Sequence, residues 1–144
     1  MQDCVLCNED GGKIIYTNHL FRIVLPSEPD YPGFTRIIAN PHVKELTDLS
    51  QSDAEEIFSA LYNVELAIRK IYLPDKINIA SLGNVVPHLH WHIIPRYIND
   101  KHYPNPIWGA VVNPEYAPDR KLYALEQSLV SQIISICTLL CDVQ

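Results

Sequence analysis

Three histidines alternate with apolar residues in one short stretch of the chain. His88, His90 and His92 stand two positions apart, and each residue between them is apolar. Side chains two positions apart on a β-strand point to the same face, so the three imidazoles are expected to line one accessible face while their neighbours face the core. A histidine ring is neutral or charged near neutral pH, because its ordinary pKa is about 6.5. One strand can therefore hold a neutral ring, which is able to act as a nucleophile, together with a charged ring, which is able to stabilise a phosphate.

The same three imidazoles are also suitable ligands for a catalytic zinc ion. Three histidines that leave one coordination position open are a common arrangement in zinc enzymes. No Asp or Glu lies within the histidine stretch, although hydrolytic metal sites often include a carboxylate. Nucleophilic catalysis is the preferred hypothesis, and a zinc hydrolase stays as an alternative that a chelator would distinguish.

A second motif, Cys4-Val5-Leu6-Cys7, lies at the start of the chain. A Cys-x-x-Cys pair is half of a tetrahedral zinc site, and the other half needs two ligands that folding brings near. His42, which follows a predicted strand, and His88, which begins the histidine stretch, are the candidates. Four such ligands would form a closed structural site. A redox pair and two buried reduced thiols are the alternatives.

The rest of the sequence predicts a sheet packed on helices. Apolar residues at helical spacing predict two main helices, one beginning at Ser52 with Glu55 completing a capping box, and one from about Arg120. A turn at Gly83-Asn84 is expected to join the last two strands in a hairpin. The chain is therefore expected to be α+β, with an antiparallel sheet of about five strands and two main helices. The predicted strands cover residues 13–16, 20–25, 35–39, 76–81 and 85–94.

Composition and charge narrow the class of protein. The chain has 144 residues, 47% hydrophobic and 19% charged, which suits one globular domain. Its net charge of −6 argues against broad nucleic-acid binding, which needs a basic surface. We find no secretory signal and no apolar run of about 18 residues, so we expect no membrane span and a cytoplasmic protein with reduced cysteines. Cys137 and Cys141, four apart on the last predicted helix, are then expected to pack in the core.

The stretch from His88 to Ile94 matches the signature His-φ-His-φ-His-φ-φ, with φ apolar, and so resembles the histidine-triad (HIT) family. The resemblance covers about residues 4–97, and residues 105–108 are similar to a bacterial subgroup described as diadenosine-polyphosphate hydrolases. It implies one HIT-like domain over residues 1–144, with a core at 4–97 and a proline-rich arm and C-terminal helix at 98–144. It also implies a homodimer. Residues 97–119 would either cover the site or contact the partner, and we expect the partner, because Trp108 is flanked by prolines.

The resemblance further implies a nucleotide hydrolase or transferase. Its substrates would be nucleoside 5′-phosphates with a leaving group, such as diadenosine tetraphosphate or an adenosine phosphoramidate. His90 would attack the α-phosphorus and form a nucleotidyl-histidine, from which water releases the monophosphate. His92 would bind the phosphate and help the leaving group, while His88 would support His90 or join Cys4, Cys7 and His42 around a structural zinc ion. No catalytic cofactor is expected. The expected substrate-binding residues are Gly83, Asn84, Asn78 and Arg96.

The chain departs from the family pattern just before the triad. Family members usually have Gly-Gln-Ser or Gly-Gln-Thr there, whereas this chain has Asn84 and Val85 after the glycine, so the hydroxyl is missing. The acidic residue that holds the ribose is replaced by Pro26, with Glu28 or Asp30 as substitutes nearby. These departures favour a second hypothesis, a nucleotide-binding regulatory dimer with little turnover.

Overall fold

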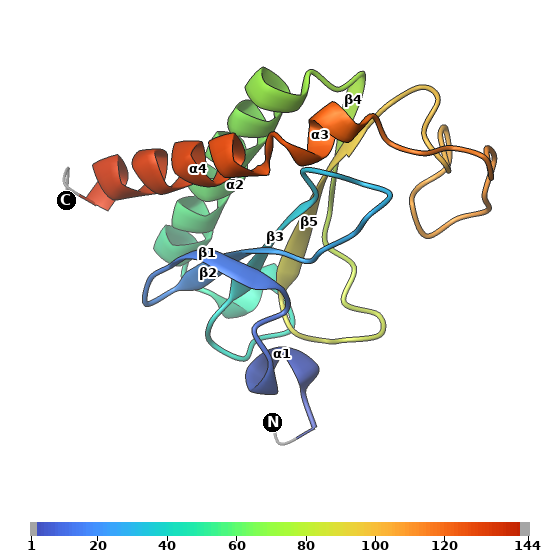
Figure 1. The fold of residues 1–144 in the computed structure, drawn as a ribbon. Coiled ribbons are helices and arrows are strands. Elements are labelled where there is room, and N and C mark those ends of the chain that lie inside the picture. The colour runs from blue at the N-terminus through green and yellow to red at the C-terminus, as the bar shows by residue number, and fades with distance from the viewer. Residues whose placement is uncertain (1–2, 142–144) are drawn as a thin grey trace.

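The computed structural model describes residues 3–141, without the side chain of Cys141, so the packing expected of that thiol lies outside the described residues. Its centre is one antiparallel sheet of five strands in the order β1-β2-β3-β5-β4 (Figure 1). The α+β class and the five strands predicted from the sequence are confirmed. The strands are β1 (Lys13–Thr17), β2 (Phe21–Leu25), β3 (Thr35–Ala39), β4 (Lys76–Ala80) and β5 (His90–Arg96).

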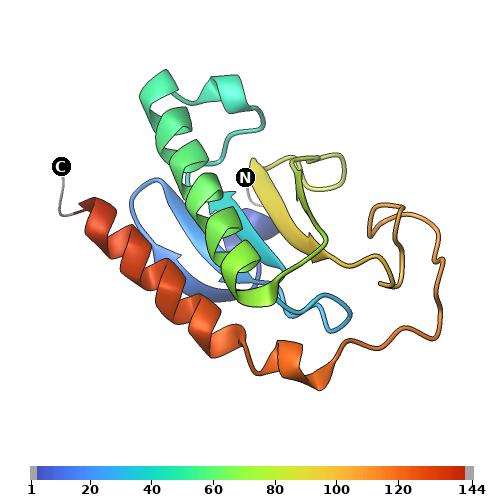
Figure 2. The same cartoon turned by 90° about the horizontal axis from the view of Figure 1, so that it is seen from above.

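Two long helices cover one face of this sheet (Figure 2). They are α2 (Gln51–Tyr72) and α4 (Glu126–Cys141), and they contribute Ile57, Val64, Leu129 and Ile133 to the main core. Burying such apolar side chains is the main favourable term in folding. The smaller helical elements are α1 (Val5–Asn8), the 3₁₀ turn η1 (Leu46–Asp48) and α3 (Arg120–Tyr123).

The ends of α2 differ slightly from the prediction. Its N-cap is Ser50, whose hydroxyl accepts a hydrogen bond from the Asp53 amide at 3.1 Å, so the capping box predicted from Ser52 is wrong by two positions. An N-cap hydroxyl satisfies an amide that has no partner within the helix, and Ser50 meets that need one residue before the helix begins. At the other end Leu73 adopts a left-handed conformation and Pro74 follows, as expected for a helix stop.

The antiparallel pairing predicted for β4 and β5 is confirmed, but the tight turn expected at Gly83-Asn84 is wrong. Residues 81–89 form an irregular connection, and β5 begins at His90 rather than at residue 85. Pro87 has no amide hydrogen to donate to a strand ladder, which accounts for the late start. The residue just before β5 bonds elsewhere, because the Leu89 amide donates to the Val43 carbonyl and the Leu89 carbonyl accepts from the Ala39 amide. This places His88 beside the end of β3 rather than on a strand.

The C-terminal region forms two helices, α3 and α4, where one continuous helix is predicted. Leu129, Ile133 and Cys137 are buried against the main core, which confirms the core position expected of Cys137. The stretch from Arg120 to Leu140 also has the length and hydropathy of a membrane span, and 17% of its most apolar window is buried. Ile134 and Leu139 are among its exposed apolar residues.

Candidate functional site

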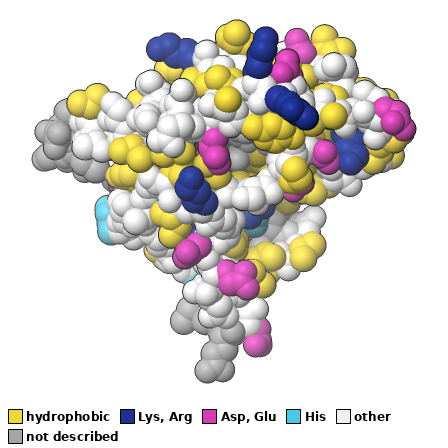
Figure 3. Space-filling model, viewed as in Figure 1, with side chains coloured by type: hydrophobic (Ala, Val, Ile, Leu, Met, Phe, Trp, Pro, Cys, Tyr) yellow, Lys and Arg dark blue, Asp and Glu magenta, His cyan; other side chains and the backbone are white. Residues whose placement is uncertain are grey.

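Strand β5 places its histidines on the face of the sheet away from α2 and α4. Trp91 and Ile93 point into the main core, so His90 and His92 point to the opposite face, as the alternation predicts. That face is not accessible, however, since His90 is 8% and His92 7% exposed. On the face of the molecule drawn in Figure 3, histidine side chains are visible only in small areas. The predicted accessible face is wrong because aromatic and arginine side chains from other segments cover it.

His90 has one ring nitrogen fixed and the other available. Its Nδ1 lies at hydrogen-bond distance from the backbone carbonyl of His88. A carbonyl only accepts, so Nδ1 carries the proton and Nε2 keeps its lone pair. Burial lowers the pKa of His90, and the positive charge of Arg36 lowers it further. His90 is therefore a neutral imidazole at pH 7 with a nucleophilic nitrogen.

His92 lies next to His90 in a tighter environment. Its ring centroid is 4.9 Å from that of His90, 5.6 Å from Phe34 and 5.0 Å from Trp108. The Arg36 Nε donates to His92 Nδ1 at 3.4 Å. Burial, followed by the charge of Arg36, lowers the pKa of His92 to about 3. His92 is thus neutral at pH 7, and the bond from Arg36 leaves its proton on Nε2.

Trp108 belongs to the long irregular segment between β5 and α3 (Figure 1). The sequence analysis expects this arm to contact a dimer partner, but Trp108 lies against His92 of its own chain. The arm is held at its base by Asp100, a buried carboxylate that accepts from the backbone amides of Tyr97, His102 and Tyr103. The arm is therefore part of the wall of the histidine site.

A cavity of about 230 Å³ opens beside His90. Gly83, predicted as a substrate-binding residue, lies in its wall together with Lys44 and Ser81. The Ser81 hydroxyl donates to the backbone carbonyl of His90 at 2.7 Å. Asn84, also predicted to bind substrate, is exposed next to Gly83 and is not part of this wall.

The other two predicted substrate-binding residues lie together, away from His90. Arg96 donates to the Asn78 side chain at 2.7 Å and forms a buried ion pair with Asp100, also at 2.7 Å. It is four residues along β5 from His92, or roughly 13 Å at the usual rise per residue. Arg96 connects β4, β5 and the base of the arm, and its substrate-binding role stays a prediction.

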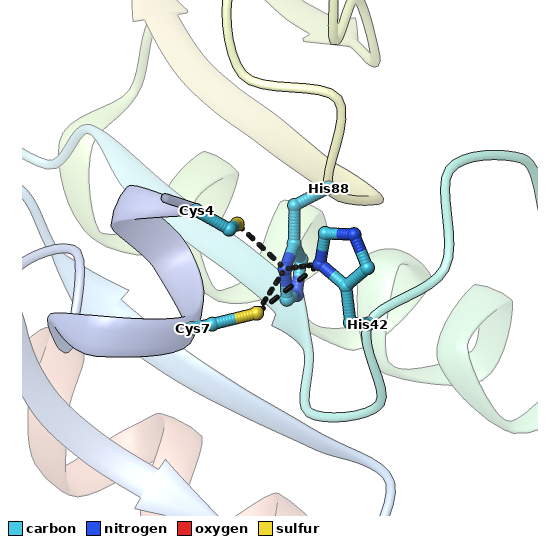
Figure 4. Close-up of side chains that lie close together, drawn as sticks. All are labelled: Cys4, Cys7, His42 and His88. Atoms are coloured by element: carbon cyan, nitrogen blue, oxygen red, sulfur yellow. Dashed lines mark hydrogen bonds between the residues drawn. The ribbon is translucent and has the colours of Figure 1, made fainter. Parts of the chain in front are cut away.

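Cys4, Cys7, His42 and His88 form a compact cluster at the opposite end of β5 (Figure 4). Their ligand atoms all lie within 4.8 Å of one another. The Sγ of Cys4 and that of Cys7 are each 3.5 Å from His88 Nδ1, while His42 Nδ1 is 3.1 Å from Cys7 Sγ and 3.2 Å from His88 Nδ1. Ligands of a tetrahedral zinc ion would stand about 3.3–3.8 Å apart, given bond lengths of about 2.0–2.3 Å. The four predicted ligands therefore fit a zinc ion.

Three separate segments build this cluster. Cys4 caps α1 and Cys7 lies within it, His42 follows β3, and His88 precedes β5. His88 is 1% exposed, and its Nε2 lies 2.6 Å from the Ala39 carbonyl. That carbonyl requires the proton on Nε2 and leaves the Nδ1 lone pair facing the thiols, as a metal-binding histidine requires. A structural metal site is thus a better reading than a redox pair.

This arrangement separates the three histidines that the sequence analysis places in a row. His88 turns toward the cysteines, whereas His90 and His92 remain together under Arg36 and Trp108. Within residues 3–140, His90 and His92 belong to no group of three or more potential metal ligands. The arrangement does not favour the alternative in which all three histidines bind one catalytic zinc ion.

Arg36 is the site residue that sequence analysis misses. It lies in the middle of β3, directly opposite His92 in the strand pairing. The other four residues of β3 are buried. A single arginine within an otherwise buried strand is the signal that could have identified it, because burying a charge without a purpose is costly.

Comparisons with known proteins agree with this geometry. The family model described as HIT domain matches residues 8–99. A histidine triad protein of Bradyrhizobium japonicum has a similar structure, with a TM-score of 0.69 and 30% identity over 88% of this chain and 90% of that chain.

Two curated relatives have names that describe an activity. A Schizosaccharomyces pombe bis(5′-nucleosyl)-tetraphosphatase, the asymmetrical type, is 31% identical over 60% of this chain and 50% of its own length. A Mycobacterium tuberculosis AP-4-A phosphorylase is 26% identical over 83% of this chain and 65% of its own length. The chain thus spans about half to two thirds of these two relatives.

Proposed function

Because the chain belongs to the HIT domain family, we propose that it cleaves nucleoside 5′-phosphate derivatives at the α-phosphorus, with His90 as the nucleophile. Candidate substrates are dinucleoside polyphosphates, such as diadenosine tetraphosphate, and nucleoside phosphoramidates. The observation that carries the proposal is the state of His90. Its Nδ1 is bound to the His88 carbonyl, which leaves Nε2 with its lone pair, and His90 lies in the wall of the cavity of about 230 Å³. The names of the two curated relatives support this class of substrate.

The first step forms a bond between Nε2 of His90 and the α-phosphorus, while the bond from phosphorus to the leaving group breaks. The leaving group takes the bonding electron pair and departs as a polyphosphate or, after protonation, as an amine. His92 is neutral, so it acts as a hydrogen-bond donor through Nε2 rather than as a cation. Dividing one displacement into two steps lowers the barrier of each.

The second step transfers the nucleotidyl group to an acceptor. Water attacks the phosphorus, the bond to His90 breaks, and the water proton leaves to solvent, which yields the nucleoside monophosphate. Inorganic phosphate in place of water would yield a nucleoside diphosphate, as a phosphorylase requires. The two relatives differ in this respect by name, so the acceptor is a separate question for experiment.

We also propose that the cluster of Cys4, Cys7, His42 and His88 holds a structural zinc ion. Two thiolates and two imidazoles are a usual ligand set for structural zinc, and they leave no position open for substrate. Such an ion would fasten α1 to the ends of β3 and β5. The residues that carry out the reaction remain His90 and His92.

Two copies of the chain are proposed to pair through α2. Phe58, Tyr62 and Leu66 follow one another at intervals of four, so they form a stripe along the helix, and all three are exposed. A continuous apolar stripe of this kind is typical of an interface. Tyr62→Glu should then shift the protein from dimer to monomer in light scattering, whereas a dimer that persists would exclude this surface.

The test of the activity is a small panel of substrates. The protein is incubated with diadenosine tetraphosphate and with adenosine phosphoramidate, in water and with inorganic phosphate, and the release of AMP and ADP is measured beside His90→Ala. AMP release that disappears in the variant supports hydrolysis, and ADP that requires phosphate supports phosphorolysis. Intact-protein mass spectrometry after a short reaction should detect the nucleotidyl adduct on the wild type and not on His90→Ala.

One observation supports a second function, which is nucleotide binding with little turnover. Val85 is 93% exposed and offers no hydroxyl to a phosphate. A protein that binds AMP but releases no product from any substrate of the panel would be a nucleotide-binding regulatory protein.

A further inference from the structure

Two arginines occupy the histidine face of the sheet on neighbouring strands. Arg22 pairs with Ile38 and Arg36 with Val24 in the ladder between β2 and β3, so both side chains leave the same face. A buried charge usually has its hydrogen bonds satisfied within the protein. The two arginines differ in this respect.

The guanidinium of Arg22 has its hydrogen-bond partners within the protein. Its guanidinium donates to the backbone carbonyls of Leu6, Glu9 and Asp10 and to the Asn40 side chain, at 2.7–3.1 Å. All three of its nitrogens therefore have partners. Arg22 fixes the N-terminal segment against the sheet, and no nitrogen of its guanidinium is without a protein partner.

Arg36 has a donor without a protein acceptor. Its Nη1 donates to the Gly11 carbonyl at 2.9 Å and its Nε to His92 Nδ1 at 3.4 Å, whereas Nη2 has no hydrogen-bond partner among residues 3–140. No carboxylate of these residues lies within ion-pair distance of Arg36, since the ion pairs there join Arg96 to Asp100 and Lys101 to Asp30. Glu28 is the carboxylate whose charge acts on it from farther away. A partly buried arginine without an ion-pair partner is what a site for an external anion requires.

We propose that Arg36 contacts the substrate, binding a non-bridging oxygen of the α-phosphate through Nη2 while its Nε holds His92 as a hydrogen-bond donor. The proposal rests on the proposed function in taking a nucleotide as the ligand. It assigns two tasks to one side chain on β3, a charge for the phosphate and an orientation for the ring beside it.

The charges of the neighbouring residues explain why an arginine is needed. His92 accepts from Arg36 through Nδ1 and the attack needs an unprotonated Nε2 on His90, so neither ring brings a positive charge to a phosphate. The amide of Asn84 and the apolar Val85 add no charge where family members carry a glutamine and a hydroxyl. Arg36 is the cation in contact with His92, and a guanidinium stays protonated at any pH of interest.

The second task concerns the position of the proton on His92. An imidazole whose Nδ1 accepts from Arg36 carries its proton on Nε2 and presents an N–H to the phosphate. Without this bond, the neutral ring is free to adopt either tautomer. Lysine would keep the charge, but its single nitrogen would not reproduce two donors in a fixed plane.

The experiment uses Arg36→Gln and Arg36→Lys, with Arg69→Gln on the exposed face of α2 as the control. Binding of AMP and of adenosine is measured by calorimetry, because only AMP carries the phosphate. Arg36→Gln should weaken AMP binding by about tenfold or more, the value of about one charged hydrogen bond, and leave adenosine unchanged. Arg69→Gln should leave both unchanged. Equal loss of AMP and adenosine would make Arg36 a structural residue and overturn the phosphate contact, as would a wild type that binds AMP no tighter than adenosine.

The orientation task has its own measurement in the free protein. Nitrogen-15 chemical shifts of the His92 ring should report a proton on Nε2 in the wild type and a mixture of tautomers in both Arg36→Gln and Arg36→Lys. An unchanged Nε2 proton in both variants would overturn this part. Turnover is not needed for either measurement, so a wild type that binds AMP and cleaves nothing would refute the proposed hydrolysis and leave the assignment of Arg36 standing.

Discussion

The cluster of Cys4, Cys7, His42 and His88 and the histidine pair of His90 and His92 occupy the two sides of one short stretch of chain, yet they are built on different principles. The cluster joins three segments distant in sequence, which together contribute four ligands that point to a common centre. The pair comes from one strand and acquires its properties from what covers it, namely Arg36, Phe34 and Trp108. Alternation along a strand sets the direction of a side chain, but the surroundings set its chemistry.

His88 connects the two regions. Its ring belongs to the cluster, while its backbone carbonyl accepts from His90 Nδ1 and so fixes the ring of the proposed nucleophile. The carbonyl belongs to a backbone segment that is also held by the bonds of Leu89 to Ala39 and Val43. We therefore expect substitutions in the cluster to change mainly the stability of the protein. Substitutions of His90 or His92 should change mainly the rate of the reaction.

The largest expected effect is on the rate when the nucleophile is removed. His90→Ala should lower AMP release by about a thousandfold or more, because the covalent step has no substitute nucleophile. Zinc content by atomic absorption and the thermal unfolding midpoint should change little. Turnover that persists in this variant would place the reaction on another residue, and a large loss of zinc would show that the two regions are not separate.

The next effect is on stability when the cluster is broken. A ligand that binds only the folded state at a thousand times its dissociation constant stabilises it by about 4 kcal/mol. Cys7→Ser should lose most of this contribution, and a chelator should lower the unfolding free energy of the wild type but not of the variant. The rate per folded molecule should fall less than tenfold.

Cys137→Ser is the matched control for the loss of a thiol. Cys137 is buried against the main core and does not belong to the cluster. Its substitution should lower stability equally with and without zinc. Activity that a chelator abolishes in protein that is still folded would instead support a catalytic metal.

The two regions also differ in how far the sequence predicts them. The cluster can be predicted from residue types, because a Cys-x-x-Cys pair and two histidines next to strands are typical ligands of structural zinc. All four predicted ligands lie together in the structure. Alternation likewise places Leu89, Trp91 and Ile93 in the core as predicted. The burial of the pair does not follow, since it depends on Trp108 and Phe34, which reach His92 from segments with no periodic pattern. The start of β5 was missed because Pro87 and the bonds of Leu89 override the alternation.

The third prediction concerns the pH dependence of stability. The pKa of His92 is about 3 in the folded protein and about 6.5 in an unfolded chain, so the unfolded state binds more protons between these values. The contribution of His92 to stability is therefore complete above pH 6.5 and decreases as the pH falls. Between pH 6.5 and 4.5 the decrease approaches about 2.7 kcal/mol at most.

Denaturant unfolding at several pH values tests this sign. His92→Asn should show a smaller loss of stability on acidification than the wild type, because it removes the group that must be protonated. His19→Asn, a change at an exposed histidine, is the control and should lose as much unfolding free energy per pH unit as the wild type. Equal slopes in all three proteins would mean that His92 is not held neutral by its surroundings.

The smallest expected effect tests whether the arm belongs to the site or to a partner. Trp108→Ala should expose His92, raise its pKa toward the ordinary value and increase KM several-fold, which corresponds to about 1 kcal/mol. Phenylalanine at this position should restore part of the effect, because it still covers the ring. Val111→Ala, at another exposed position of the arm, should change neither the pKa of His92 nor KM.

Light scattering should give the same mass for Trp108→Ala as for the wild type, because Trp108 contacts His92 of its own chain. If the variant changed its oligomeric state while His92 kept its low pKa, the arm would hold a partner, and the burial of the pair would rest on Phe34 and Arg36 alone.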